Sequence, residues 1–389
     1  MQNIPAGDRG ARVLLILLIV MGLACALWAA PGTSPAERPP VVIGVCLPLS
    51  DRDGSGQVQS RALRIEQRIR PLAGDSRVEL IVKDTLASAE GTRKALQSML
   101  AEHDVAALIG GDTPDEAAAM LDVVSRDRRL KAHPVPVVIT TAGEPLTDAP
   151  HKPWRVSTPL AGKARAAAGF AVGKLKAKRV GILLDPADAG GVRLASLFSS
   201  ALIAQGGVVA EIAYLGKTEW SRRTALAALT RKRVEVIFLP DALNAPQVIV
   251  YARDQGIKTP FLLADVRREW GFVKAVGASK DVYVVMDFHP AFALGENAKR
   301  FLEIYRREHG EPETIAALTA DAYFLLCDAL PQRRAGKGRY QAQTPMPASK
   351  DTGYLSGRID MSTAGAIVRD VYICEIHASR LRCLETVRP

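Results

Sequence analysis

The sequence predicts an α/β fold of two lobes, each built on a doubly wound parallel sheet. From Val41 onward, short runs that are apolar throughout alternate with segments of helical periodicity, as in parallel strands covered by helices on both faces. The alternation restarts after residues 156–161, so two successive units are expected. Several of the apolar runs end in aspartate, at the strand ends where open parallel sheets bind ligands.

The first 30 residues are typical of an export signal. Arg9 and Arg12 precede an apolar run over residues 13–30 that contains a small-residue cleavage motif. Cleavage is the favoured interpretation, and the alternatives are a retained membrane anchor or a lipoprotein acylated at Cys25. All three export the remainder, so we expect a periplasmic protein with a proline-rich linker over residues 31–40.

The elements of the two units follow from the apolar pattern. In the first unit, strands are predicted over 41–49, 78–84, 105–112 and 135–141, with helices over 58–69 and 89–100 and from Thr113. In the second, strands are predicted over 179–185, 208–215, 234–241 and 260–265, and helices over 164–175, 192–205, 222–230 and 247–255; the segment 281–292 follows. Helices over 297–309 and 313–330, a loop over 331–351 and a C-terminal hairpin complete the chain.

Composition and missing motifs exclude several classes of function. The net charge is +10, but the basic runs at 174–179 and 230–233 lie at predicted helix ends, where cations complement the helix dipole. We therefore expect no nucleic-acid partner; the alternative to a solvated surface is attraction to anionic lipid. No dinucleotide turn, phosphate loop, nucleophile elbow or zinc motif occurs, and His289 is interpreted as structural. We expect no enzyme activity, no cofactor and no metal.

Cysteine positions fit an exported protein. Cys374 and Cys383 flank the segment "EIHASRLR", and a turn at Ala378 and Ser379 would place the two cysteines opposite each other on one hairpin. This register predicts a cross-strand disulfide, and the alternative is a pair of reduced, buried thiols.

The aspartates at the strand ends and one strand-helix junction are the candidate binding groups. The aspartates are Asp84, Asp112, Asp185, Asp241 and Asp265. We assign Asp84 and Asp185 to turns; Asp241 and Asp265 either cap helices or meet a cationic or amino group. At the junction, Thr113 before Pro114 is either a plain helix start or part of a carboxylate site.

The ordered series of segments resembles one family across residues 41–386. It includes "VVIGVCLPLS", "VAALIGG", "VPVVITTAGEPL", "AKRVGILLD", "GIKTPFLLAD" and "SGRIDMSTAGAIVRDVYICEI". The series is similar to the periplasmic binding proteins of branched-chain amino-acid (Leu/Ile/Val) ABC transporters, the type I solute-binding proteins. The resemblance implies two lobes joined by three crossovers, here residues 41–158 plus 287–365 and residues 159–286 plus 366–389.

The resemblance also implies a function and a site. A monomer would bind a small amino-acid-like ligand between the lobes and deliver it to an inner-membrane ABC permease. The implied ligand-binding residues are Asp112, Thr113, Thr141, Ala142 and Glu144 at the ligand carboxylate and Asp265 at its ammonium, where the strand-end pattern adds Asp241. Alanines at 189 and 242 replace aromatic walls, and Glu144 replaces a threonine, so a ligand larger, more polar or more cationic than leucine is expected. The alternative is an envelope interaction protein that keeps the fold without a ligand.

Overall fold

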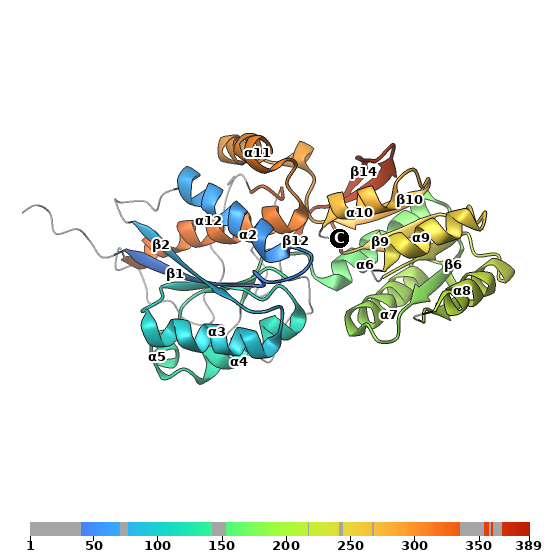
Figure 1. Cartoon of the computed structure of the whole chain (residues 1–389). Helices are drawn as coiled ribbons and strands as arrows, with labels where there is room; N and C mark the ends of the chain where they lie inside the picture. The colour runs from blue at the N-terminus through green and yellow to red at the C-terminus, as the bar shows by residue number, and fades with distance from the viewer. Residues whose placement is uncertain are drawn as a thin grey trace, which may run out of the picture. The chain divides into compact units, whose positions relative to one another are not determined.

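Two parallel sheets, one after the other along the chain, organise the fold (Figure 1). The computed structural model describes residues 40–70, 77–141, 153–216, 218–240, 244–266, 268–334, 354–357, 359–360 and 368–389. The expected signal and nearly all of the linker therefore lie outside the described residues. Both sheets belong to one unit, from Val41 to Pro389. No helix in the described part of the chain is long and apolar enough to cross a membrane.

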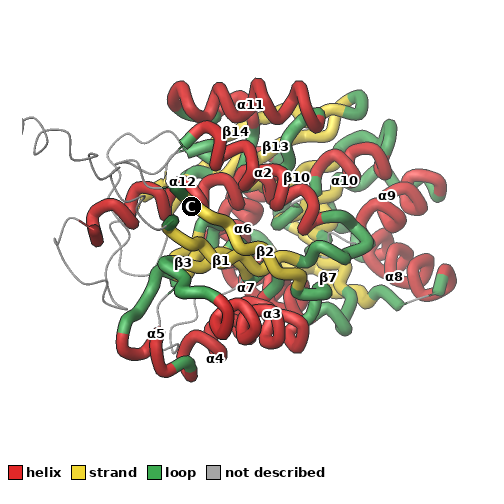
Figure 2. Tube along the Cα trace, turned by 60° about the vertical axis from the view of Figure 1, so that its left-hand side comes forward, coloured by secondary structure: helices red, strands yellow, loops and turns green. Residues whose placement is uncertain are grey.

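The first sheet has five parallel strands in the order β2-β1-β3-β4-β5. They are β1 (Val41–Leu47), β2 (Val78–Asp84), β3 (Ala107–Gly110), β4 (Val137–Ile139) and β5 (Trp154–Arg155). One face of this sheet packs on α3 (Ala89–Glu102) and α4 (Pro114–Arg126), and α5 (Arg128–Ala132) follows α4. The other face packs on α2 (Ser55–Ile69) and α12 (Thr314–Arg334). In Figure 2, α3 and α4 again lie on the opposite side of β1 and β2 from α2. Helix α11 (Gly295–His309) packs on α2.

The second sheet has seven strands in the order β14-β13-β10-β9-β8-β6-β7. The parallel strands are β6 (Arg179–Leu184), β7 (Val208–Tyr214), β8 (Val236–Phe238), β9 (Phe261–Ala264) and β10 (Val282–Met286). One face packs on α6 (Leu160–Gly169), its π-helical extension η1 (Phe170–Lys174) and α7 (Ala189–Ala204). The other packs on α8 (Glu219–Arg231), α9 (Ala245–Asp254) and α10 (Glu269–Val276).

Local sequence explains why these elements begin and pack where they do. Ser88 and Thr218 cap α3 and α8, each accepting a backbone N–H from three residues further on. Gly44 in β1 has no side chain because Met99 of α3 and Leu108 of β3 occupy that space; a Cβ there would lie 2.3 Å from the Met99 sulfur. Helix and sheet therefore approach closely.

The C-terminal hairpin adds two antiparallel strands, β13 (Val371–His377) and β14 (Arg380–Val387), to the edge of the second sheet. Its turn is at Ala378 and Ser379, as expected, and both residues have positive φ, the geometry of a two-residue hairpin turn. Cys374 lies opposite Cys383, which confirms the predicted register. The structure holds both as thiols, so it does not contain the expected disulfide, and that bond stays a prediction.

The chain passes between the two sheets three times. It crosses from β5 to α6, then after β10 toward the short 3₁₀ helix η2 (Pro290–Phe292) and α11, and finally between β12 (Val368–Arg369) and β13. β12 pairs with β11 (Ile359–Asp360) in a separate two-stranded ladder. The lobe boundaries drawn from the sequence stay a prediction. The expected end of the last long helix is wrong, because α12 continues four residues past Leu330 to Arg334.

Candidate functional site

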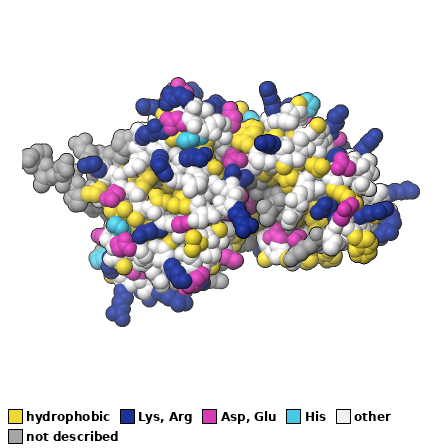
Figure 3. Space-filling view, in the orientation of Figure 1, with side chains coloured by type: hydrophobic (Ala, Val, Ile, Leu, Met, Phe, Trp, Pro, Cys, Tyr) yellow, Lys and Arg dark blue, Asp and Glu magenta, His cyan; other side chains and the backbone are white. Residues whose placement is uncertain are grey.

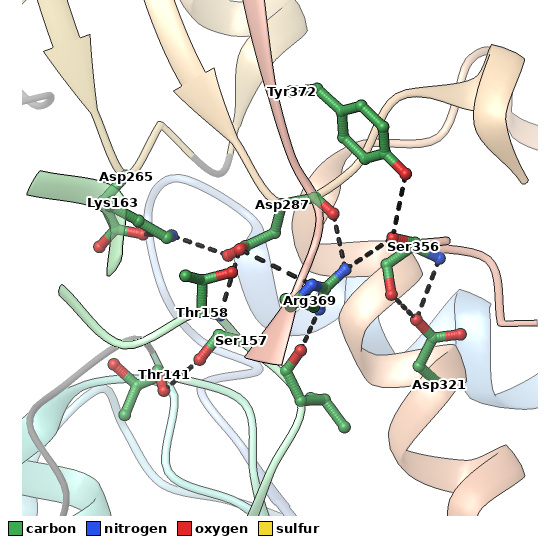
Figure 4. Close-up of polar contacts among 11 residues, drawn as sticks. Thr141, Ser157, Thr158, Lys163, Asp265, Asp287, Asp321, Ser356, Arg369 and Tyr372 are labelled. Atoms are coloured by element: carbon green, nitrogen blue, oxygen red, sulfur yellow. Dashed lines mark hydrogen bonds and ion pairs between the residues drawn. The ribbon is translucent and has the colours of Figure 1, made fainter. Parts of the chain in front are cut away.

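A buried lysine joins the ends of two neighbouring strands in the second sheet (Figure 4). Asp265 directly follows β9 and Asp287 directly follows β10, and because these parallel strands pair, the two carboxylates reach the same edge. Lys163, in the first turn of α6, places its Nζ 2.5 Å from Asp265 Oδ1 and 2.7 Å from Asp287 Oδ2. Only 1% of its side chain is exposed, against 26% for Asp265.

A second buried cation, Arg369 of β12, connects all three crossovers. Its guanidinium donates to the carbonyl of Val156 in the first crossover, to that of Asp287 in the second (2.6 Å) and to that of Ser356 before β12 (2.9 Å). It also lies 3.9 Å from the Asp287 carboxylate, which accepts the backbone N–H of Thr158 at 3.1 Å. Arg369 and the Asp287 carboxylate thus hold together the point where the chain changes sheets.

Further hydrogen bonds extend this network into the first sheet and α12 (Figure 4). Asp321 of α12 accepts the backbone N–H of Leu355 at 2.7 Å and both the N–H and the hydroxyl of Ser356. On the other side, Ser157 donates its hydroxyl to the carbonyl of Thr141 at 2.5 Å. The predicted site residue Thr141 is therefore linked through the first crossover to the network around Asp287.

The charges in this network compensate one another. Burial lowers the pKa of Lys163, but the attraction of Asp265 and Asp287 outweighs it and holds the pKa above its usual value. Burial raises the pKa of Asp287, but Lys163 and Arg369 outweigh it and hold the pKa low. Lys163 and Arg369 thus face Asp265 and Asp287, and Arg369 also attracts the buried carboxylate of Asp321.

At the strand-helix junction after β3, the chain's own carboxylate occupies the donors expected for a ligand. Thr113 accepts the backbone N–H of Glu116 at 3.3 Å, and Glu116 accepts both the N–H and the hydroxyl of Thr113 at 3.1 Å. The other Glu116 oxygen accepts the Thr85 hydroxyl at 2.5 Å. This is a capping box at the start of α4, so Thr113 has the structural role that the sequence left open.

The remaining predicted residues fall into two groups. Asp112 is buried and accepts the side-chain amide of Gln59 at 3.0 Å, and Thr141 donates its N–H to Gly111 at 3.1 Å, so the junctions after β3 and β4 adjoin. The others, Ala142, Glu144 and Asp241, lie outside the described residues. Their ligand roles stay predictions.

Three residues that the sequence assigned to structural roles accept backbone N–H groups two residues further along the chain. Asp84 accepts the N–H of Leu86, Asp185 accepts that of Ala187, and His289 accepts that of Ala291 through Nδ1. Figure 3 shows Lys and Arg side chains spread among acidic ones on the visible face, without a continuous basic stripe.

A further set of contacts joins the start of α10 to the start of α12. Glu269 is buried and accepts the N–H of Thr314 at 2.9 Å, while Glu313 accepts the N–H of Trp270 at 3.3 Å. Each helix therefore receives a carboxylate from the other at its N-terminus. Arg268 adds an ion pair to Glu313 at 2.5 Å and contacts Asp53 in the loop after β1.

Sequence reasoning missed Lys163, Asp287 and Arg369. Asp287 carried a signal, because it ends an apolar run, "VYVVMD", as the five other aspartates do. Lys163 and Arg369 carried none, since nothing in their local sequence indicates burial.

The chain is similar to known binding proteins. The model of the periplasmic binding protein family matches residues 40–379. A leucine-binding protein LivK from Thermotoga maritima is 23% identical with a TM-score of 0.75, over 90% of this chain and 99% of that one. A LivJ protein from Streptococcus pneumoniae in complex with isoleucine is 20% identical with a TM-score of 0.75, over 90% and 100%. A solute-binding protein from Rhodopseudomonas palustris in complex with 4-hydroxybenzoate is 18% identical with a TM-score of 0.73, over 90% and 97%. No curated protein sequence matches the chain.

Proposed function

Because the chain belongs to the periplasmic binding protein family, we propose that it is the solute-binding protein of an ABC transporter. It binds a small organic acid between its two lobes, delivers it to an inner-membrane permease and carries out no chemistry. Solved relatives with this fold bind isoleucine in one case and 4-hydroxybenzoate in another, both of them small carboxylates. The protein works as an exported monomer in the periplasm.

The observation that carries this proposal is the position of Asp265. Its backbone has φ 66°, a left-handed conformation that costs a non-glycine residue energy and that often marks functional sites. It stands at the carboxyl end of a central strand, where open parallel sheets bind ligands, and its side chain is partly exposed. One carboxylate oxygen pairs with Lys163, and the carboxylate borders the crossovers about which the lobes would close.

The proposed ligand site comprises the ends of β3 and β4 on one lobe and the end of β9 on the other. It includes Asp112, Thr141 and Asp265 among the described residues, and we retain Ala142, Glu144 and Asp241 from the sequence. Thr113, the remaining residue expected from the sequence, borders this site but serves the start of α4: its N–H and hydroxyl both donate to Glu116, and its carbonyl accepts the N–H of Ala117.

Native mass spectrometry of gently purified protein tests the proposal. We expect a small bound mass that is lost on denaturation, and intact mass should show a chain cleaved after the signal. Small-angle scattering should then show a more compact protein once the released acid is added back. If no bound mass appears and no small acid binds, the protein is an interaction protein on the same fold and the proposal is wrong.

A further inference from the structure

We propose that Lys163 sets the ligand class by neutralising Asp265, so that the site takes an organic acid without an amino group. This inference rests on the proposed function and specifies its ligand. The bound solutes of two solved relatives, isoleucine and 4-hydroxybenzoate, share a carboxylate and differ in the ammonium. The ammonium is the group that the resemblance assigns to Asp265, so the state of Asp265 discriminates between the two kinds of ligand.

Asp265 already has an ammonium partner inside the protein. Lys163 Nζ lies 2.5 Å from Asp265 Oδ1, so the carboxylate of Asp265 meets any solute as one half of an ion pair. Asp265 would attract a solute ammonium at its exposed oxygen, but Lys163, within a few ångströms, would repel it and offset much of that attraction in a site shielded from water. A solute hydroxyl can donate to the same oxygen without adding a charge.

A solute cannot displace Lys163 from this position. Its side chain is 1% exposed and is held on the other side by Asp287 at 2.7 Å. Removing a buried ammonium from both carboxylates would leave uncompensated charges in the interior, which is strongly unfavourable. Lys163 is therefore a fixed partner of Asp265, buried beneath the proposed binding surface.

Holding the crossovers does not by itself require Lys163. Asp287 has a second cation in Arg369 and accepts the N–H of Thr158, and Arg369 contacts all three crossovers without Lys163. Within the described residues, the ion pairs of Asp265 are limited to the one with Lys163. The distinctive consequence of Lys163 is thus the neutralisation of Asp265.

The experiment uses matched acids that differ only in the amino group. The pairs are leucine with 4-methylpentanoate and phenylalanine with 3-phenylpropanoate, titrated calorimetrically into protein freed of bound solute. We expect the wild type to bind the amine-free member at least about tenfold more tightly in at least one pair. In Lys163→Met the uncompensated Asp265 should shift this ratio toward the amino acid by about tenfold or more.

Two further variants separate specificity from folding. Lys163→Met with Asp265→Asn removes both charges, so the ratio should return toward that of the wild type. Lys174→Met removes an exposed cation from η1 and should leave the ratio unchanged. If Lys163→Met does not fold, the double variant alone decides the matter, because removing both charges should leave the ratio within about threefold of that of the wild type.

The outcomes distinguish this inference from the proposed function. Amino acids that bind the wild type as tightly as their amine-free partners, or a copurified solute with a basic amine, overturn the inference and leave the proposed function intact. A tenfold loss of amino-acid binding alone in the double variant also overturns it. If no small acid binds and none copurifies, the proposed function fails and the inference fails with it.

Discussion

Replacing Arg369 should destabilise the protein more than replacing any exposed arginine. In Arg369→Met the aliphatic part of the side chain is kept, while the three donors to the carbonyls of Val156, Asp287 and Ser356 are lost. Arg369 and Asp287 are both fully buried, so water cannot replace those donors without opening the crossovers.

The expected magnitude follows from the contacts. Each buried acceptor left without a donor costs about 1 to 3 kcal/mol, and the Ser356 carbonyl keeps a second donor, the Tyr372 hydroxyl at 3.4 Å. Asp287 also keeps Lys163, so the full cost of an unpaired buried charge is avoided. Burial of the methionine side chain offsets a further part, of about 1 kcal/mol. The net loss should be about 4 kcal/mol, a large share of the roughly 5 to 15 kcal/mol that stabilises a typical folded protein.

Guanidinium unfolding followed by circular dichroism measures this loss. For a protein of this size the unfolding free energy falls by about 5 kcal/mol per molar of guanidinium. The unfolding midpoint of Arg369→Met should therefore lie below that of the wild type by somewhat less than about 1 M. Arg231→Met, at an exposed position in α8, is the matched control and should shift it by less than about 0.1 M. Arg369→Lys keeps the positive charge but lacks the planar fork that donates to all three carbonyls. Its unfolding midpoint should therefore lie between those of Arg369→Met and Arg231→Met. If Arg369→Met unfolds within about 1 kcal/mol of the wild type, the guanidinium does not hold the crossovers together.

Three shorter predictions concern other parts of the structure. Burial raises the pKa of Glu269 to about 7 from the ordinary 4.5, so the folded state keeps a proton that the unfolded chain loses. The stability this proton gives is complete below pH 4.5, and about 3 kcal/mol of it is lost as the pH rises through 7. The midpoint of urea unfolding should therefore fall between pH 5 and pH 8 in the wild type, and Glu269→Gln should make it less dependent on pH. Non-reducing peptide mapping of the exported protein should find Cys374 bonded to Cys383, a link worth about 2 to 3 kcal/mol at most, and two free thiols would contradict it. Thr113→Val should lower the unfolding free energy by about 1 kcal/mol through loss of the α4 cap, and an unchanged urea midpoint would show that the cap is unimportant.

The fold could be predicted because its signals are local. A strand buried on both faces is apolar along its whole length, and each run of that kind from "VVIGVCL" to "FLLA" became a parallel strand. The hairpin register followed from the position of its turn, which Ala378 and Ser379 adopt with positive φ. The end of α12 could not be placed in this way, because the helix continues through Pro331, a residue that more often ends one.

The site could be predicted only in part, because its partners come from distant segments. The strand-end pattern located Asp265, but Lys163 is 102 residues away in the sequence, and only the packing of α6 beside β9 brings the two together. At Thr113 the opposite holds, since its partner Glu116 is three residues away and the sequence already indicated a plain helix start as the structural alternative. A polar residue at a strand end therefore identifies a place where a ligand can bind, and its tertiary partners determine which charge it presents. For Asp265 that partner is an internal ammonium, and it makes the local charge at the end of β9 near neutral, where the sequence alone indicated an anion.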